Sequence, residues 1–300
     1  MLYNCKEVKE FSFCQTEGRF AHPRIKFSEL LFVLILSTLF FNLSAFCSPP
    51  QGRILFIDTS KTAKTSLAVI KPDGSGKKNI SPEFENIMFP QTVEKMGMIG
   101  VTNRRYNLRS EIFFVMPNQK KIRKVTNGAV FHDFSTNGNF VLFTPSDNKS
   151  PLMVYSFKKH AFIKLSDRKI TSARWSPKGD WIITSALLPD GSSDLFLIST
   201  KAQGVVRLTK TPGVNESFPV FANDGKHIAY ITDKYGRSEI ELMNIETHVS
   251  KRPLIVGAYP SFSPDNQWIC FESGSEIMIS RVNGLDQKVL CHGRTPIWIK

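Results

Sequence analysis

Acidic and histidine side chains are the groups of this 300-residue chain that could support hydrolytic or metal chemistry. Four oxygen-bearing residues precede β-type runs and could reach a common axis: Glu85, Asp133, Asn215 and Glu216. Carboxylate and amide oxygens of this kind hold metal ions in hydrolases. However, they stand at different distances from the run that follows, so no symmetric ligand set emerges. We therefore interpret them as solvated loop residues.

Patterns typical of a catalytic or zinc site do not occur. None of the 6 histidines belongs to a His-x-His or His-x3-His pair, and the pentapeptide Gly-x-Ser-x-Gly of serine hydrolases is missing from the sequence. His132-Asp133 stands next to an apolar run and could face a channel, but a histidine there is more often a surface or core-edge residue. We expect no metal, no cofactor and no enzymatic activity.

One pattern recurs about every 41 residues between residues 85 and 265. An aromatic or apolar residue is followed by a turn with Gly or Asn, a β-branched run, a polar loop and a second β-rich run. The aligned residues are Val93, Phe134, Trp175, Phe221 and Phe262, at spacings of 41, 41, 46 and 41 residues. A period of this length, with several short strands in each repeat, is typical of propeller blades.

The ends of the chain predict how the blades close. A single four-stranded blade cannot bury both of its faces, and a ring supplies the missing neighbours. Residues 52–57 match the second strand of a blade, whereas 294–300 match a first strand, with Trp298 36 residues after Phe262. We therefore predict an all-β fold over 49–300, a six-bladed β-propeller of four-stranded blades whose ring is closed by the C-terminal strand.

The clearest repeat resembles the blade of a known family. Residues 207–230 read Arg-Leu-Thr-Lys-Thr-Pro-Gly-Val-Asn-Glu-Ser-Phe-Pro-Val-Phe-Ala-Asn-Asp-Gly-Lys-His-Ile-Ala-Tyr. This string is similar to the blade repeat of the TolB family, periplasmic propeller proteins of the bacterial Tol–Pal system. The resemblance covers roughly 51–300 and is weakest at 83–103. TolB proteins carry an α/β domain ahead of the propeller, for which we expect no room in this chain, so the resemblance is to the propeller domain only.

The first 48 residues predict export. Residues 30–46 are almost unbroken apolar and follow Arg24 and Lys26. This run is short for a membrane span and slightly long for the apolar core of a signal peptide. Two interpretations stay open, a cleaved signal peptide and an uncleaved membrane anchor. Both place residues 49–300 in the periplasm or elsewhere outside the cytoplasm.

The net charge bears on the class of partner, and the cysteines bear on whether a disulfide can form. The formal net charge of +13 favours contact with an anionic surface or an acidic partner, although scattered surface lysines that keep the chain soluble would explain it too. No nucleic-acid motif occurs, so nucleic acid is not expected. Cys270 and Cys291 should lie on the second and fourth strands of one blade, too far apart for a disulfide.

These observations favour a non-enzymatic scaffold that binds a protein or peptide of the cell envelope. The resemblance implies a Tol–Pal-like lipoprotein as partner, and the N-terminal segment would contact the membrane if uncleaved. The connections from fourth to first strands should supply a binding rim around a central funnel. The candidate binding residues are Asn86, Gln91, His132, Arg174, Asn215, Glu216, Tyr259 and Arg294. The alternative is a metal-dependent hydrolase of the lactonase type that uses the axial channel.

Overall fold

Each repeat folds back on itself at the turn that follows its first strand. The computed structural model describes residues 49–60, 64–104, 110–147, 149–201 and 204–300, so the predicted signal peptide or anchor lies outside the described residues. Gly138, Gly179 and Gly225 close three of these turns with φ of 75°, 74° and 69°. Only a residue without a Cβ adopts such a backbone at little cost. The predicted turns are confirmed.

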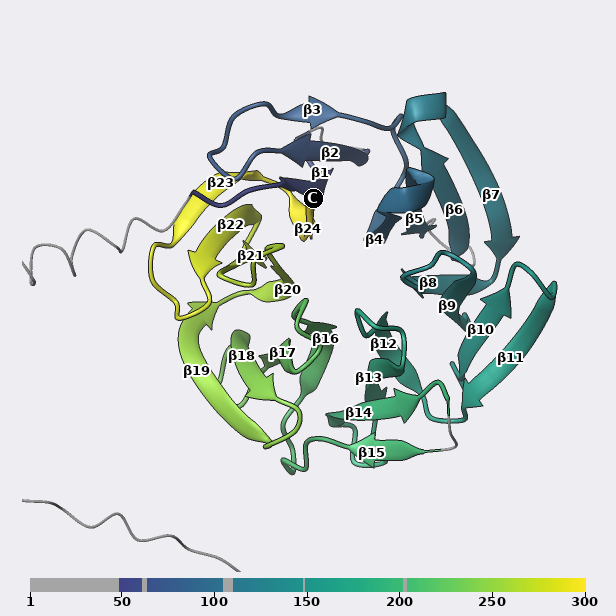
Figure 1. Cartoon of the computed structure of the whole chain (residues 1–300), viewed down its shortest axis with the longest axis vertical. Helices are drawn as coiled ribbons and strands as arrows, with labels where there is room; N and C mark the ends of the chain where they lie inside the picture. The colour runs from purple at the N-terminus through teal and green to yellow at the C-terminus, as the bar shows by residue number, and fades with distance from the viewer. Residues whose placement is uncertain (1–48, 61–63, 105–109, 148, 202–203) are drawn as a thin grey trace, which may run out of the picture. The chain divides into compact units, whose positions relative to one another are not determined.

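Six four-stranded antiparallel sheets are arranged as blades around a central axis (Figure 1). In every blade the first strand is innermost and the fourth is outermost. From first to fourth strand, blade 1 contains β24 (Arg294–Ile299), β1 (Arg53–Asp58), β2 (Ser66–Ile70) and β3 (Lys78–Asn79). Blade 2 contains β4 (Ile87–Val93), β5 (Met98–Asn103), β6 (Glu111–Met116) and β7 (Lys121–Asn127). Blade 3 contains β8 (Ala129–Phe134), β9 (Phe140–Pro145), β10 (Leu152–Ser156) and β11 (Ala161–Ser166).

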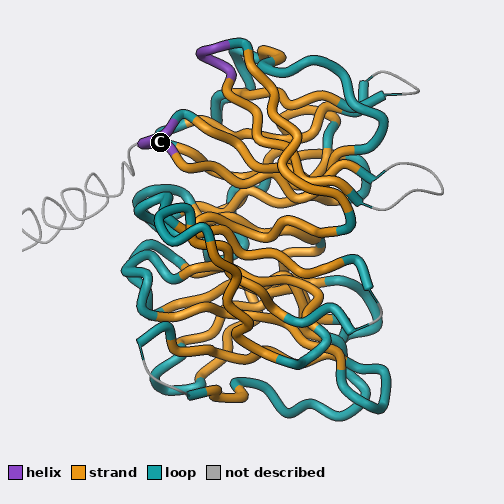
Figure 2. The backbone as a smooth tube through the Cα atoms, turned by 90° about the vertical axis from the view of Figure 1, so that its right-hand side faces the viewer, coloured by secondary structure: helices purple, strands orange, loops and turns teal. Residues whose placement is uncertain are grey.

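The remaining blades follow the same order. Blade 4 contains β12 (Ile170–Trp175), β13 (Trp181–Leu187), β14 (Ser193–Ser199) and β15 (Val205–Arg207). Blade 5 contains β16 (Glu216–Phe221), β17 (His227–Thr232), β18 (Glu239–Asn244) and β19 (Val249–Val256). Blade 6 contains β20 (Ala258–Phe262), β21 (Trp268–Ser273), β22 (Glu276–Arg281) and β23 (Lys288–His292). Seen from the side, strands form the wall of the ring, and loops and turns gather on its two faces (Figure 2).

Helix is confined, in the described part of the chain, to two 3-10 turns in blade 2. η1 (Glu94–Met96) lies in the turn between β4 and β5, which ends at Gly97 with φ of 57°, and η2 (Pro117–Gln119) joins β6 to β7. No helix among the described residues has the length and apolar character needed to cross a membrane. The unusual η1 turn explains why the repeat is weakest in this stretch of sequence.

The hydrophobic core is divided into six clusters, one between each pair of neighbouring blades. β1 shows how one strand serves two of them. Ile54 and Phe56 pack toward blade 6, while Leu55 and Ile57 pack toward blade 2, and all four are at most 1% exposed. Because alternate side chains leave opposite faces of a strand, both faces of a blade are buried only when neighbours stand on each side.

The ring is closed inside blade 1. β24 pairs with β1 through Arg53–Ile299, Ile54–Trp298 and Leu55–Ile297. The indole Nε1 of Trp298 donates to the carbonyl oxygen of Gln51 at 2.7 Å. β24, the last strand of the chain, therefore occupies the innermost position of the blade that contains β1, as predicted. Cys270 and Cys291 are both free, which agrees with the expectation of no disulfide between them.

Candidate binding site in the axial channel

The first strand of every blade is irregular where it faces the axis. Its pairing with the second strand shifts register between Met88 and Gln91 in β4 and between Ser217 and Val220 in β16. The other four first strands contain a comparable shift. A β-bulge of this kind inserts extra residues, bends the strand and redirects its side chains. The bulges therefore determine which side chains turn toward the channel.

In four blades the bulge contains a left-handed residue followed by proline. Phe89, Phe218, Tyr259 and Thr295 have φ of 53°, 48°, 53° and 45°, and each precedes a proline. Such a backbone costs roughly 1–3 kcal/mol for a residue other than glycine, and it concentrates at functional sites. Proline suits the next position because a residue in a bulge need not donate to the strand ladder.

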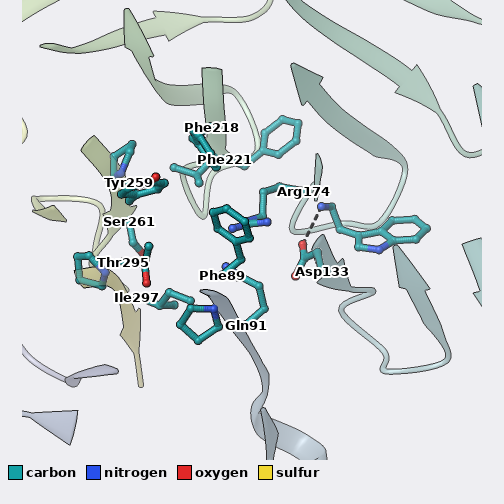
Figure 3. A pocket seen from close by; sticks show the side chains of 15 residues that line it. Phe89, Gln91, Asp133, Arg174, Phe218, Phe221, Tyr259, Ser261, Thr295 and Ile297 are labelled. Carbon is teal, nitrogen blue, oxygen red and sulfur yellow. Dashed lines mark hydrogen bonds between the residues drawn. The ribbon is translucent and has the colours of Figure 1, made fainter. Parts of the chain in front are cut away.

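Three of these side chains meet at the axis. The ring centroids of Phe218 and Tyr259 are 4.6 Å apart, and that of Phe89 lies 5.6 Å and 6.3 Å from them. Phe89 comes from blade 2 and Phe218 from blade 5, which stand on opposite sides of the ring (Figures 1 and 3). Side chains thus fill the axis at this level. We call Phe89, Phe218 and Tyr259 the aromatic plug.

A guanidinium group and a carboxyl group lie beside the aromatic plug (Figure 3). Arg174, on β12, donates through Nη1 to the carbonyl oxygen of His132 at 2.5 Å and to the carbonyl oxygen of Ala173 at 3.0 Å. Asp133, on β8, accepts hydrogen bonds from the backbone N–H groups of Phe134 at 2.8 Å and Trp175 at 2.9 Å. Both groups are therefore held in place by main-chain atoms of blades 3 and 4.

Burial changes the acid–base properties of both groups. Desolvation raises the pKa of the Asp133 carboxyl to about 6, although the Arg174 charge and the two N–H donors act in the opposite direction. Desolvation also lowers the pKa of the Arg174 guanidinium, opposed by the charge of Asp133. A guanidinium nevertheless stays protonated at any physiological pH. The site is thus a fixed cation beside a carboxyl group that titrates near neutrality.

Two cavities follow one another along the channel. The first, of about 180 Å³, is lined by the aromatic plug together with Arg174, Asp133 and other first-strand residues, and we call it the axial cavity. The second, of about 360 Å³, is lined by Lys95, Ser135, Thr136 and their neighbours, and we call it the mouth cavity. Asp133 and Trp175 line both. The mouth cavity therefore lies on the face formed by the turns between first and second strands.

Five of the eight predicted binding residues lie at the axial cavity or at the edge of the first strands. Gln91, Arg174 and Tyr259 line the axial cavity. Asn86 and Arg294 stand at the starts of the neighbouring strands β4 and β24, where Nη2 of Arg294 donates to Oδ1 of Asn86 at 3.5 Å. These two lie on the other face of the ring, because first strands begin there and end at the mouth cavity.

The other three lie outside the channel. Asn215 is exposed, and its side-chain amide donates to Asp233 at 2.7 Å. His132 is 3% exposed, its Nε2 is 3.1 Å from Oγ1 of Thr144, and desolvation lowers its pKa to about 3. Glu216 is also 3% exposed, buried between blades 4 and 5. His132 and Glu216 thus present no side chain to a solvated rim.

The interpretation of the four oxygen-bearing residues as solvated loop groups is correct for two of them. Glu85 and Asn215 are exposed. It is wrong for Glu216, which the neighbouring blade covers, and for Asp133, which lies within β8 and lines the channel. The error arises because a residue next to a strand in sequence is solvated only when no neighbouring blade packs over it.

The sequence alignment missed Phe89 and Phe218 of the aromatic plug because it followed the residue at the end of each first strand, whereas Tyr259 was among the predicted binding residues. Phe221 lies two residues after the bulge proline of blade 5, and Thr92 lies two residues after the bulge proline of blade 2. Thr92 is therefore the structural equivalent of Phe221, although the alignment placed Val93, the next residue, at that position. The signal was present in the sequence as an aromatic-proline pair, Phe89-Pro90 and Phe218-Pro219, just ahead of the aligned position. The aligned Trp175 and Phe221 also line the axial cavity as well as packing between blades.

Comparison with known proteins agrees with this architecture. TolB of Francisella tularensis, a Tol–Pal system protein, is 33% identical over 98 residues, which are 32% of this chain and 22% of the relative. TolB of Helicobacter pylori is 27% identical over 205 residues, 67% of this chain and 47% of the relative. The crystal structure of Acinetobacter baumannii TolB superposes with a TM-score of 0.74 at 20% identity, covering 88% of this chain and 71% of that one. The propeller is TolB-like. The matched region spans less than half of either curated relative, and no protein-family profile matches the chain.

Proposed function

We propose that this TolB-like propeller is an exported, non-enzymatic protein that binds a protein or peptide of the cell envelope through its axial channel. The observation that carries the proposal is the channel itself, in which strained first strands aim aromatic and charged side chains into the axial cavity beneath an open mouth cavity. The curated relatives are named as Tol–Pal system proteins, which supports an envelope partner, with a Tol–Pal-like lipoprotein as the first candidate.

The geometry suits holding a partner. Both oxygens of Asp133 accept backbone hydrogen bonds, and Arg174 donates to main-chain carbonyl oxygens, so both groups are held in fixed positions beside the axial cavity. A metal-dependent hydrolase needs several ligands that converge on one point. Among the described residues, no group of three His, Cys, Asp or Glu side chains is placed to hold an ion. The channel therefore favours binding over the hydrolase alternative.

Site-specific crosslinking tests where the partner binds. A photoreactive residue at Thr136, an exposed residue of the mouth cavity, should give a crosslinked product with an envelope protein in intact cells. Thr126, an exposed residue of the outer strand β7, is the matched control and should give none. A product from Thr126 without one from Thr136 would move the binding site to the outer wall of the blades.

Metal analysis separates the proposal from the hydrolase alternative. The purified protein should contain no stoichiometric calcium or zinc and should not hydrolyse ester or lactone substrates. One equivalent of metal together with turnover that a chelator removes would favour the hydrolase and contradict a purely binding role.

A further inference from the structure

The guanidinium of Arg174 has capacity for a ligand. Arginine presents five N–H donors in a planar fork, whereas the hydrogen bonds that Arg174 makes all use Nη1 and end on main-chain carbonyl oxygens. Within the described part of the chain, Arg174 forms no ion pair with a carboxylate. Buried charges in proteins are normally paired. A half-buried cation that faces a cavity without an ion-pair partner therefore indicates an anionic ligand.

The nearest carboxylate does not take that role. Each oxygen of Asp133 accepts a hydrogen bond from a backbone N–H group, that of Phe134 or that of Trp175, and among the described residues no hydrogen bond or ion pair joins Asp133 to Arg174. Asp133 and Arg174 interact through space only. Arg174 lines the axial cavity and its hydrogen bonds within the described residues use Nη1, which leaves Nε and Nη2 as donors for a carboxylate that could accept two parallel hydrogen bonds.

The rest of the axial cavity limits what the anion is attached to. Beside Arg174, its lining consists largely of the rings of the aromatic plug, prolines and Ile297, with the polar side chains of Gln91, Ser261 and Thr295 among them (Figure 3). Its volume of about 180 Å³ is below the roughly 300–1,000 Å³ of cavities that take drug-sized ligands. It therefore fits one small apolar group that carries a charge.

The approach to the cavity is also basic. Lys95 and Lys300 line the mouth cavity, and Asp133, at its inner end, is the only acidic side chain among its lining residues. Positive charge around a narrow entrance concentrates anions and speeds their association. This distribution agrees with the net charge of +13 of the whole chain.

We propose that the axial cavity holds a carboxylate borne on an apolar group, the C-terminal residue of a partner polypeptide, with the carboxylate on Arg174 and the side chain against the aromatic plug. A chain end fits a cavity that side chains close at its inner end, because an internal segment would have to continue past the aromatic plug. The inference rests on the proposed function, since it names the part of the partner that enters the channel.

A pair of small probes tests the carboxylate directly. N-acetyl-leucine and N-acetyl-leucinamide differ only in the charged group, and calorimetry with the full chain should show at least tenfold tighter binding of the acid. Arg174→Met should reduce the affinity for the acid to that for the amide. Arg123→Met, at an exposed position of β7, should leave the preference unchanged. Equal binding of acid and amide, or no binding of either, would overturn the proposal.

Folding of the variant has to be controlled, because Arg174 also bridges blades 3 and 4. Arg174→Lys keeps the charge but loses the fork, so it should retain the native fold and bind the acid several-fold more weakly than the unmodified protein. If the lysine variant bound the acid as tightly as arginine does, bidentate recognition would be wrong.

Peptides separate a chain end from a free acid. A nine-residue peptide that ends in a free leucine carboxylate should compete with N-acetyl-leucine, and the same peptide with an amidated end should not. Binding of the free acid without the peptide would overturn the chain-end assignment. These measurements need no natural partner. If no crosslinked product formed at Thr136 while N-acetyl-leucine still bound, the proposed function alone would be contradicted. If the crosslinked product formed but N-acetyl-leucine did not bind, this inference alone would be contradicted.

Discussion

Glu216 and Asp194 bring two carboxyl groups into one buried corner between blades 4 and 5. Glu216 is 3% exposed and Asp194 is fully buried, and the hydroxyl of Ser193 donates to the main-chain oxygen of Glu216 at 3.0 Å. Burial, helped by the neighbouring Asp194 charge, raises the pKa of Glu216 to about 7, whereas hydrogen bonds from Thr209 and Thr211 lower it. Asp194 itself is paired with Arg207.

This corner should make stability depend on pH. The folded protein keeps the Glu216 proton more tightly than the unfolded chain, whose carboxyl pKa is near 4.5. The stabilising contribution of the protonated form is therefore complete below about pH 4.5 and is lost as pH rises through about 7. Glu216→Gln keeps a neutral group of the same shape, so it should raise the Tm at pH 8 and change it little at pH 5.

Calorimetric melting of both proteins at the two pH values measures this effect. One kcal/mol corresponds to roughly 2–4 °C in Tm for a domain of this size. Asp147→Asn, at an exposed loop position, is the control and should give no difference between the two pH values. A Glu216→Gln variant that is less stable than the unmodified protein at pH 8 would show that the carboxylate itself is required.

In each of three blades, an ion pair joins the third strand to the fourth strand. Glu111 pairs with Lys124, Asp194 with Arg207, and Glu239 with Arg252, each pair 13 residues apart in sequence. Each acid is the first or second residue of its third strand and is buried, with the side chains 9%, 0% and 0% exposed. Because the fourth strands are largely exposed, these pairs anchor the outer edge of their blades.

Removing the charge of one such acid should loosen its blade. Glu239 accepts hydrogen bonds from Arg252 and Arg237 at 2.7 Å, and these arginines lower its pKa to about 2. Glu239→Gln should lower the free energy of unfolding by roughly 1.5–3 kcal/mol, the value of hydrogen bonds to charged groups. Asp167→Asn breaks the exposed pair with Lys164 and should cost less than about 0.5 kcal/mol. Urea denaturation of both variants measures the difference, and similar small losses would contradict the anchoring role.

Gly100 on β5 lets blades 2 and 3 approach closely. A Cβ built on it would lie 2.4 Å from the ring of Phe131, which is fully buried on β8. Gly100→Ala should therefore cost about 1–3 kcal/mol by overpacking. Gly204, whose surroundings are open, is the matched position, and Gly204→Ala should be nearly neutral.

The clash itself is tested by a double variant. If the Phe131 ring causes the loss, Gly100→Ala combined with Phe131→Leu should be less destabilised than the sum of the two single changes, as measured by denaturant unfolding. Additive losses would instead place the cost in the backbone of Gly100.

At the scale of the whole molecule, the fold could be predicted because the repeat is local. The β-branched runs that follow the turns in three repeats, at 140–143, 181–184 and 227–230 in the sequence, predict strands that start where β9, β13 and β17 start. The predicted runs end too early. The turn fixes where a strand begins, but pairing with the neighbouring strand decides where it ends, and β13 continues to Leu187 because Leu187 pairs with Ser193 of β14. Blade number and closure followed from the spacing alone.

The candidate site was less accessible to sequence reasoning. The bulges that direct Phe89 and Phe218 to the axis change the count along each first strand, so residues at equal spacing do not occupy equal places. The burial of Glu216 depends on the neighbouring blade, which no local pattern reveals. Arg174, Gln91 and Tyr259 were predicted to lie on connections between fourth and first strands, but they lie within first strands, the elements that surround the axis in any propeller.

Removal of residues 295–300 tests closure of the ring. The deletion takes most of β24 away and leaves one edge of β1 unpaired, next to apolar residues such as Ile54 and Phe56. An open apolar edge promotes association between chains, so the shortened protein should be oligomeric or insoluble. Removal of Lys300 alone, beyond the end of β24, is the control and should leave a monomer. Size-exclusion chromatography distinguishes them, and a monomeric 295–300 deletion with an unchanged Tm would rule out the seam.

The hydrogen bond between Trp298 and Gln51 joins residues 247 positions apart, and this has a consequence for biosynthesis. During synthesis, the blades between them can form in turn, but blade 1 stays incomplete until β24 has emerged. Contacts of such long sequence separation form slowly. The nascent chain therefore carries β1 with one edge unpaired for almost its whole period of emergence, which is when a holding chaperone is most needed.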